Sequence, residues 1–416
     1  MLERLGRTVN LTIVGYGCRG ETQTDLLLNM PDVKIVCVCD QYQDRTEKAA
    51  KRVFEKQGHM PFATQNASEA IQFADAEAVV IMTGWETHIP LAIKALRAGK
   101  SVAMEVGGAM DINECWELVE ESERTGKPVM LLENCCYGQE EMALLRMVRD
   151  GVFGELVHLE GGYLHDLREE IGKGDINRHY RQTHFLTRNC ELYPTHELGP
   201  IAKYLRINRG NRMVSLVSMA SKAVSLNQWL QENRADSPLK DAKANEGDVV
   251  TTMIKCANGE TIYLKHGCTL PRPYSRGGLI EGTKGIWRED GRMIYIEGDA
   301  RNPEHQYDQW ESDAIFMKDY EHPIWKAYQE FGLRGCHGGM DYLVLRAFVE
   351  SLQNGTPPPI DVYDAATWMS ITALSEESIA KGSVPVSIPD FTRGQWMFTR
   401  PETGDIFAID EGREID

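Results

Sequence analysis

Residues 9–20 of the chain read VNLTIVGYGCRG, and this stretch decides the fold of the first part of the protein. The apolar run before Gly15 is typical of a buried strand, and the residues after Gly20 have the spacing of a helix. Gly15, Gly17 and Gly20 have GxGxxG spacing. In this motif one glycine forms a tight turn, the second lets the backbone approach a pyrophosphate, and the third lets helix and strand pack closely. The stretch therefore predicts a dinucleotide-binding turn, with the phosphates at the helix N-terminus.

An acidic residue follows this turn at the distance typical of NAD binding. Asp40 ends the second predicted strand, roughly twenty residues beyond Gly20. A carboxylate at this point binds the ribose hydroxyls of NAD and repels the 2'-phosphate of NADP. Arg45 nearby weakens this preference only slightly. The alternative is a purely structural glycine turn in another doubly wound fold. The strand before the turn, the helix after it and the acidic residue Asp40 together favour NAD binding.

Further apolar strands, each after an amphipathic helix, extend the pattern through residues 76–84, 101–105 and 128–134. Such strands predict a parallel sheet covered on both faces, so we expect an NAD-binding Rossmann domain over residues 1–135. His88 follows one strand and either touches the cofactor or begins the next helix, while Glu105 and Val106 end another strand at the same edge. The predicted cofactor site comprises Gly15, Tyr16, Gly17, Cys18, Arg19, Gly20, Asp40, Gln41, Arg45, Trp85, His88, Glu105, Val106, Asn134 and His337.

The pattern changes in residues 136–416, where we expect a substrate-binding α+β domain. Several segments read as antiparallel strands, and Asn258-Gly259 marks a hairpin turn. Residues 338–355 predict a late helix that Gly355 ends. A charged loop is expected up to about residue 189, and another exposed loop over residues 231–248. The second domain is thus predicted to be an open, mostly antiparallel sheet with helices on one side.

Composition limits the classes of function. The 416 residues carry a formal net charge of −17, which argues against nucleic acid or an anionic membrane as a partner and favours a small-molecule substrate. No apolar run reaches the length of a membrane span, and the first strand begins too early for a signal peptide, so the sequence as it stands predicts a cytoplasmic protein. A leader removed beforehand would leave no trace. The ten cysteines and eleven histidines show no metal-ligand spacing, and we expect no metal.

Two levels of family resemblance follow from longer motifs. The glycine turn, the acid and the pattern THxxxAxxALRAGKxVxxE over residues 87–105 resemble the glucose-fructose oxidoreductase and inositol dehydrogenase (Gfo/Idh/MocA) superfamily. Its usual Glu-Lys-Pro lysine is absent, because this chain has Glu105, Val106 and Gly107. Five further motifs are similar to glycoside hydrolase family 109, an NAD-dependent branch that also lacks the lysine: GGYLHDLR (161–168), LYPTHELGPIAKYLRINRGNR (192–212), LVSMAS (216–221), PRPYSRGGLIEGTKG (271–285) and HGGMD (337–341).

The resemblance implies a redox-neutral glycosidase. In that family, tightly bound NAD+ takes hydride from sugar C3, elimination across C2 and C1 expels the leaving group, water adds, and the hydride returns; the best-known substrates are α-N-acetylgalactosaminides. His196, Tyr163 and Tyr193 fall at catalytic positions, and His165, Arg181 and Tyr274 at substrate positions. The structural alternatives are a capping or core role for His196 and a half-buried strand position for Tyr163.

Two other functions stay open at this stage. One is an NAD-dependent sugar or 3-keto-glycoside dehydrogenase of the wider superfamily, which would release NADH. The other is a non-catalytic NAD(H) sensor, which would not need the proton-transfer residues Tyr163 and His196. We also expect self-association through the exposed face of the second sheet.

Overall fold

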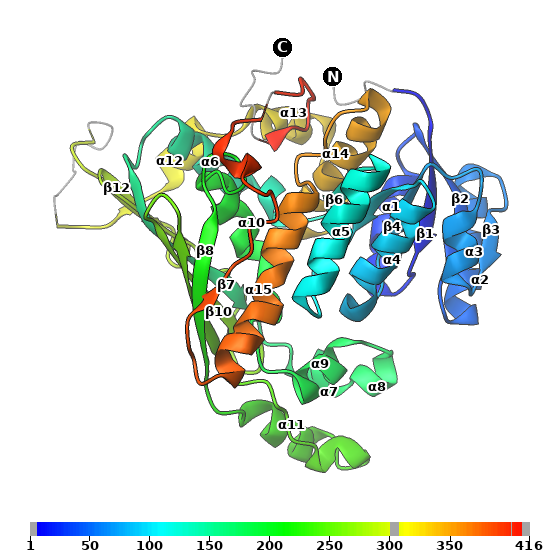
Figure 1. The fold of residues 1–416 in the computed structure, drawn as a ribbon, viewed down its shortest axis with the longest axis horizontal. Coiled ribbons are helices and arrows are strands. Elements are labelled where there is room, and N and C mark those ends of the chain that lie inside the picture. Colours follow the sequence, from blue (N-terminus) through cyan, green and yellow to red (C-terminus); the bar gives the residue numbers. More distant parts are fainter. Residues whose placement is uncertain (1–5, 300–307, 401, 410–416) are drawn as a thin grey trace.

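The computed structural model describes residues 6–299, 308–400 and 402–409. Two sheets stand side by side, with a parallel sheet and its helices on the right of Figure 1 and a larger sheet on the left. Helices α10 and α15 lie between the two sheets in this view. Among the described residues, no helix is both long and apolar enough to cross a membrane.

The first sheet has six parallel strands in the order β3-β2-β1-β4-β5-β6. Its strands are fully or almost fully buried, apart from the short edge strand β3, because helices cover both faces. This confirms the predicted Rossmann-type sheet. The elements are β1 (Val9–Val14), α1 (Cys18–Leu28), β2 (Val33–Cys39), α2 (Gln43–Gln57), β3 (Phe62–Thr64), α3 (Ala67–Gln72), β4 (Ala78–Ile81), α4 (Trp85–Arg97), β5 (Ser101–Met104), α5 (Ile112–Thr125) and β6 (Val129–Leu131).

The second sheet has nine strands in the order β14-β13-β12-β11-β7-β10-β9-β8-β15, antiparallel except where β7 meets β10. The predicted hairpin at Asn258-Gly259 joins β9 to β10. The open, mostly antiparallel sheet is therefore confirmed. Its strands are β7 (Leu156–Leu164), β8 (Met213–Ala220), β9 (Val250–Cys256), β10 (Thr261–Gly267), β11 (Leu279–Gly282), β12 (Gly285–Arg288), β13 (Met293–Ile296), β14 (Glu311–Ser312) and β15 (Val386–Ser387).

Helices cover only one face of this sheet. Along β9, Thr252 and Ile254 are buried while Met253 between them is exposed, as expected for a strand with one covered face. The late helix ends at Gly355, whose φ of +69° suits glycine. The helices and 3-10 turns of this part are η1 (Asn134–Tyr137), α6 (Gln139–Arg149), α10 (Thr195–Tyr204), α12 (Ala314–Asp319), α13 (Pro323–Phe331), η3 (His337–Gly339), α14 (Met340–Asn354), α15 (Val362–Ala380) and η4 (Gln395–Met397).

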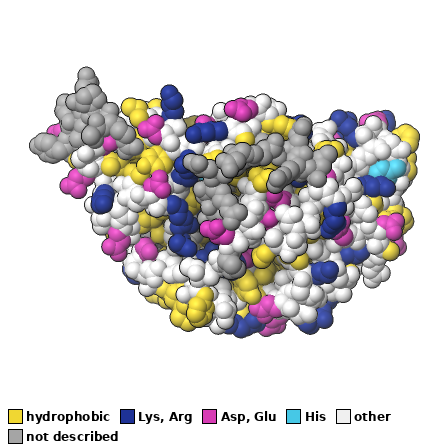
Figure 2. Space-filling view, turned by 90° about the horizontal axis from the view of Figure 1, so that it is seen from above, with side chains coloured by type: hydrophobic (Ala, Val, Ile, Leu, Met, Phe, Trp, Pro, Cys, Tyr) yellow, Lys and Arg dark blue, Asp and Glu magenta, His cyan; other side chains and the backbone are white. Residues whose placement is uncertain are grey.

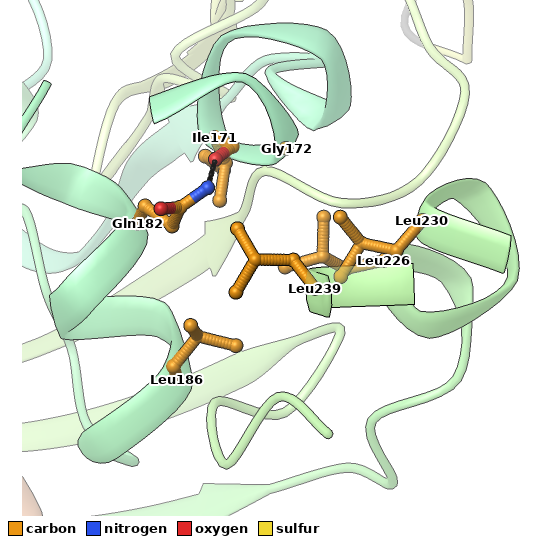
Figure 3. Close-up of a pocket in the computed structure, with 7 residues that line it drawn as sticks. All are labelled: Ile171, Gly172, Gln182, Leu186, Leu226, Leu230 and Leu239. Carbon is orange, nitrogen blue, oxygen red and sulfur yellow. Dashed lines mark hydrogen bonds between the residues drawn. The ribbon is translucent and has the colours of Figure 1, made fainter. Parts of the chain in front are cut away.

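The two predicted loops were partly wrong. Residues 168–187 form three short helices, and part of the second loop is helical; we call these elements the helical cover: α7 (Arg168–Gly172), α8 (Gly174–Asn177), α9 (Arg181–Thr187), α11 (Ser225–Asn233) and η2 (Pro238–Asp241). Figure 3 shows the apolar pocket at its centre, lined by Ile171, Gly172, Gln182, Leu186, Leu226, Leu230 and Leu239. The leucines fill this space, so the pocket is the small core of the cover and not a sugar site.

The surface carries both signs of charge. On the upper side of the molecule, shown in Figure 2, acidic and basic side chains are interspersed and hydrophobic side chains reach the surface in separate groups. Two helices of the second half also contact the first domain, because α14 packs against α1 and α15 packs against α5. The two domains are thus joined by packed helices as well as by the chain segment that connects them.

Candidate active site

Aromatic side chains from both halves meet where the Rossmann sheet faces the second domain. Trp85, the first residue of α4, lies 5.4 Å from Tyr193 between ring centroids. Tyr193 in turn lies 4.6 Å from Tyr163 of β7 and 4.7 Å from His196. Tyr274, from the loop after β10, lies 6.2 Å from Tyr163. The structure therefore brings the three predicted catalytic residues together with a predicted substrate residue and a residue assigned to the cofactor.

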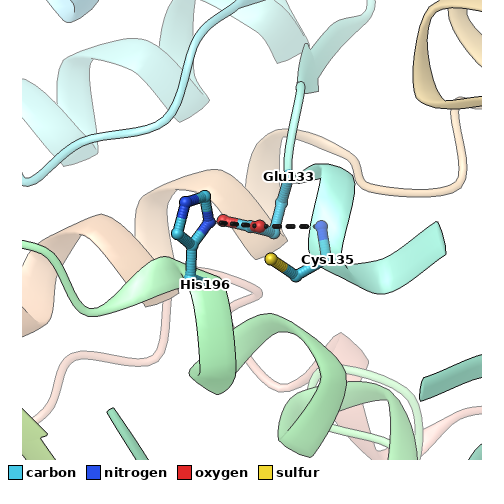
Figure 4. Close-up of side chains that lie close together, drawn as sticks. All are labelled: Glu133, Cys135 and His196. Atoms are coloured by element: carbon cyan, nitrogen blue, oxygen red, sulfur yellow. Dashed lines mark hydrogen bonds and ion pairs between the residues drawn. The ribbon is translucent and has the colours of Figure 1, made fainter. Parts of the chain in front are cut away.

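His196 sits in the first turn of α10 and has a buried carboxylate as its partner. Its Nδ1 lies 2.8 Å from Oε1 of Glu133, as Figure 4 shows. Burial alone would raise the pKa of Glu133, but the charge and hydrogen bond of His196 lower this pKa on balance. An ionised carboxylate only accepts hydrogen bonds, so Nδ1 carries a proton toward Glu133, and in the neutral tautomer Nε2 is the nitrogen with the free lone pair. This contact can orient the imidazole for proton transfer; the catalytic role of His196 stays a prediction.

Cys135 completes a close group with these two residues. Ligand atoms of Glu133, Cys135 and His196 all lie within 4.8 Å of one another, a spacing that a metal ion could use. However, Glu133 already accepts the His196 N–H and the Cys135 amide, and burial raises the pKa of the Cys135 thiol. Hydrogen bonding accounts for the group, and the expectation of no metal stays a prediction.

Tyr163 and His165 form a second polar pair beside His196. The Tyr163 hydroxyl lies 3.4 Å from Nδ1 of His165, as their two-residue spacing on one face of the chain predicts. Burial raises the pKa of Tyr163, so its phenol is protonated at neutral pH. Burial also lowers the pKa of His165, with the charge of Arg181 adding to the effect, so this imidazole is neutral. Tyr274 is about half exposed and packs edge-on against His165 at 5.2 Å.

Arg181 of α9 brings a buried positive charge to the same place. Its guanidinium carbon lies 5.2 Å from the ring centre of Tyr193, 5.4 Å from that of Trp85 and 5.6 Å from that of Tyr163. Burial opposes this charge, but the surrounding phenols and Glu170, 3.3 Å away, raise the pKa of Arg181 above its ordinary value. A planar cation held over three rings can bind hydroxyl or acetamido oxygen of a sugar.

The glycine turn fits a dinucleotide. A Cβ on Gly15 would lie 2.4 Å from the Met82 carbonyl oxygen, and one on Gly20 would lie 2.3 Å from that of Gly15. Gly15 has a φ of +97°, which also favours glycine. At Gly17, by contrast, a Cβ would meet no described protein atom closer than 3.5 Å. The backbone is therefore open only at Gly17, the N-cap of α1, where amides can receive a pyrophosphate.

Asp40 and its neighbours line the adenosine end of this turn. The Asp40 carboxylate accepts hydrogen bonds from the amides of Tyr16 at 2.7 Å and Tyr42 at 2.9 Å. Asp40 therefore fixes the backbone of the turn through these two hydrogen bonds and also places its negative charge beside the turn. Gln41 is exposed next to it, and Arg45 comes within 3.5 Å of the Cβ position of Gly17.

Four of the residues predicted to bind the cofactor join an ion-pair network around Asp341, and their contact with the cofactor stays a prediction. Arg19 donates to both oxygens of Asp341, at 2.7 and 2.9 Å, and to Glu105 at 2.8 Å. Asn134 donates to Asp341 at 2.7 Å, and Nδ1 of the half-exposed His337 lies 2.9 Å from it. The network ties the glycine turn to α14, so these residues have a structural role that their sequence positions alone did not reveal.

Three further predicted residues have distinct surroundings. The buried His88 lies in the first turn of α4, with Nε2 3.0 Å from the Thr83 carbonyl oxygen, and burial lowers its pKa to about 4. Val106 is buried, and Cys18 is exposed at the start of α1. His88 thus belongs to the first turn of the helix, in line with the second of its two predicted roles, and its contact with the cofactor stays a prediction.

Sequence reasoning missed Glu133, Tyr180 and His184. The Tyr180 and His184 rings lie 5.0 and 5.2 Å from Trp85, on the helical cover that was expected to be a loop. Glu133 lies two residues after β6, at the carboxyl edge where ligands bind in such sheets. The same reasoning that selected Asp40 and Glu105 could have found it.

Comparison with known families divides the chain in two. The profile of the oxidoreductase family with an NAD-binding Rossmann fold matches residues 9–132. The profile of the glycosyl hydrolase 109 C-terminal domain matches residues 137–398. The first half is thus an NAD-binding Rossmann fold.

Similar proteins extend this result over the whole chain. A glycosyl hydrolase family 109 protein of Stenotrophomonas maltophilia (strain K279a) is 41% identical, covering 97% of this chain and 93% of the relative. The alpha-N-acetylgalactosaminidase of Tannerella forsythia is 39% identical, covering 93% and 87%. Levoglucosan dehydrogenase in complex with NADH and levoglucosan has a similar structure, with a TM-score of 0.68 over 92% of this chain and 100% of that chain. At 17% identity, this last likeness shows the fold alone.

Proposed function

The chain belongs to glycosyl hydrolase family 109, and on this premise we propose that it hydrolyses α-N-acetylgalactosaminides in a redox-neutral cycle with bound NAD. The enzyme is an NAD-dependent glycosidase, and its substrate is a small-molecule glycoside. When bound, NAD+ supplies the oxidation at sugar C3 and the reduction that closes the cycle. The observation that carries the proposal is the His196–Glu133 pair beside Tyr163, at the carboxyl edge of the Rossmann sheet.

His196 acts on the C3 hydroxyl. Its free Nε2 accepts the hydroxyl proton during oxidation and returns it at the end. The buried Glu133 carboxylate stabilises the imidazolium that forms in between. This pair therefore supplies a proton acceptor and a negative charge that compensates the imidazolium.

Tyr163 acts on the elimination across C2 and C1. As C2 loses its proton and the C1–O bond breaks, a protonated phenol can donate a hydrogen bond to the enolate oxygen, and neutral His165 can accept the C2 proton and deliver it to the departing oxygen. Arg181 and Tyr274 bind the sugar, and Trp85 and Tyr193 pack beneath it. Trp85 Nε1 is buried without a partner among the described residues, so it offers a donor to a ligand.

The alternative is an NAD-dependent sugar dehydrogenase that releases NADH. The solved structures with this fold include a sugar dehydrogenase, but this chain lacks the lysine of the superfamily's usual Glu-Lys-Pro motif. Incubation with p-nitrophenyl α-N-acetylgalactosaminide without added NAD+ separates the two. Sustained nitrophenol release with no net NADH absorbance supports the glycosidase. NADH that accumulates without aglycone release would establish the dehydrogenase instead.

Two coarser proposals accompany this function. We place the boundary between the NAD-binding and substrate-binding domains at residue 135, with α14 and α15 bridging both.

We also propose a homo-oligomer through the open face of the second sheet, where Met219 and Met253 are 61% and 46% exposed beside Tyr263. Light scattering should show a smaller particle for Met253→Glu than for the unaltered protein.

A further inference from the structure

The helical cover of the second domain reaches the adenosine end of the Rossmann domain. Arg178, directly after α8, donates to both carboxylate oxygens of Asp44 in the first turn of α2, at 3.0 and 2.8 Å. Figure 1 shows α8 extending from the cover toward the Rossmann helices. The ion pair therefore joins the two domains on the side of the cofactor that lies away from the sugar.

An aromatic ring adds to this contact. The guanidinium carbons of Arg178 and Arg45 lie 4.3 and 4.9 Å from the ring centre of Tyr42. Tyr42 donates its amide to Asp40, and Arg45 lies beside the open backbone at Gly17. The contact thus stands next to the two features that fit the adenosine ribose and the pyrophosphate.

Arg178 makes one backbone contact and separate side-chain contacts. As the C-cap of α8 it has a φ of +54° and donates its backbone N–H to the Gly174 carbonyl oxygen, a common way for a helix to end. The side-chain contacts that the structure gives Arg178 are those with Asp44 and Tyr42, so its guanidinium lies across the domain boundary.

We propose that Arg178, Asp44 and Tyr42 form an interdomain latch that closes the adenosine half of the site and slows NAD release. The inference rests on the proposed function, since a redox-neutral cycle requires the same NAD to take and return one hydride. The cover that carries the latch also carries Arg181 into the sugar site. Closing the latch therefore positions the sugar-binding arginine while it retains the cofactor.

Cofactor release tests the latch directly. Protein loaded with NAD is passed through a desalting column, and free NAD is then followed by ultrafiltration and an enzymatic NAD assay. We expect Arg178→Gln and Asp44→Asn each to release NAD about ten-fold faster than the unaltered protein. The double variant should be little faster than either single variant, because all three lose the same contact. Arg168→Gln is the matched control, since it removes an ion pair to Asp166 within the second domain.

Salt gives a second readout. Exposed ion pairs are screened, so raising salt from about 0.1 M to about 1 M should speed release more in the unaltered protein than in the double variant. Equal release rates in all proteins, or an equal effect of Arg168→Gln, would overturn the latch. The proposed function fails separately, if protein saturated with NAD releases no nitrophenol.

Discussion

The cofactor site and the sugar site of this enzyme are built in opposite ways. The glycine turn is one continuous stretch in which a Cβ at Gly15 would collide with the backbone of Met82 and a Cβ at Gly20 with the backbone of Gly15. The proposed sugar site is made of side chains from three separated segments, which bring Tyr163, Arg181 and His196 together beside Trp85. Substitutions that enlarge a side chain should therefore weaken cofactor binding at the glycine turn. Substitutions that shorten a side chain should reduce turnover at the proposed sugar site.

Removal of the imidazole at His196 should have the largest effect. His196→Ala leaves the C3 hydroxyl without a proton acceptor, and we expect turnover to fall by roughly 10³-fold or more. The amount of bound NAD should be unchanged, because His196 lies on the sugar side. His158→Ala is the control, since this histidine contacts Thr261 and Glu160 outside the site. Near-normal turnover of His196→Ala would remove our central assignment.

Substitution of Glu133, the partner of His196, should have the second largest effect on turnover. Glu133→Gln keeps the size of the buried side chain but removes the charge that stabilises the imidazolium, and we expect turnover to fall by roughly 10²-fold. Initial rates and thermal midpoints measured together separate catalysis from folding. A large drop in the thermal midpoint with an unchanged rate per folded molecule would make Glu133 structural only.

The same contrast explains what the sequence could predict. The glycine turn, Asp40 and the strand that carries Tyr163 are local, so spacing and hydrophobic pattern predict them. The Glu133–His196 contact joins residues far apart in the chain, and spacing alone cannot reveal such a pair. Helices α7 to α9 are too short to show a clear period, so their charged sequence was interpreted as a loop. Arg19, Asn134 and His337 were predicted to bind the cofactor, but only three-dimensional packing shows that Asp341 is their common partner and that Glu105 joins them through Arg19.

Buried histidines should make each domain sensitive to acid. Burial lowers the pKa of His88 in the first domain and of His322 in the second from 6.5 to about 4. Between these two pH values the unfolded chain binds a proton that the folded chain does not, so stability is full above pH 6.5 and falls toward pH 4. The loss is about 2 kcal/mol per histidine from pH 6.5 to 5. Urea unfolding of His88→Gln should lose about this much of its pH dependence; an unchanged slope would contradict the burial argument.

Addition of one methyl group at Gly17 is the smallest change that tests whether the cofactor site depends on close approach of the backbone. Gly17 has a φ of −73°, which alanine adopts freely, and its Cβ would meet no described protein atom closer than 3.5 Å. Gly17→Ala should therefore fold normally but bind NAD about ten-fold more weakly, because the methyl group takes the space of the pyrophosphate. Gly267→Ala, in the substrate domain, adds the same group with its nearest neighbour at 3.4 Å and should leave NAD affinity unchanged. Calorimetric titration of NAD into both variants decides the point. Equal affinities would mean that the cofactor lies farther from Gly17 than the turn geometry implies, and that side chains such as Arg45 hold it more than the backbone does.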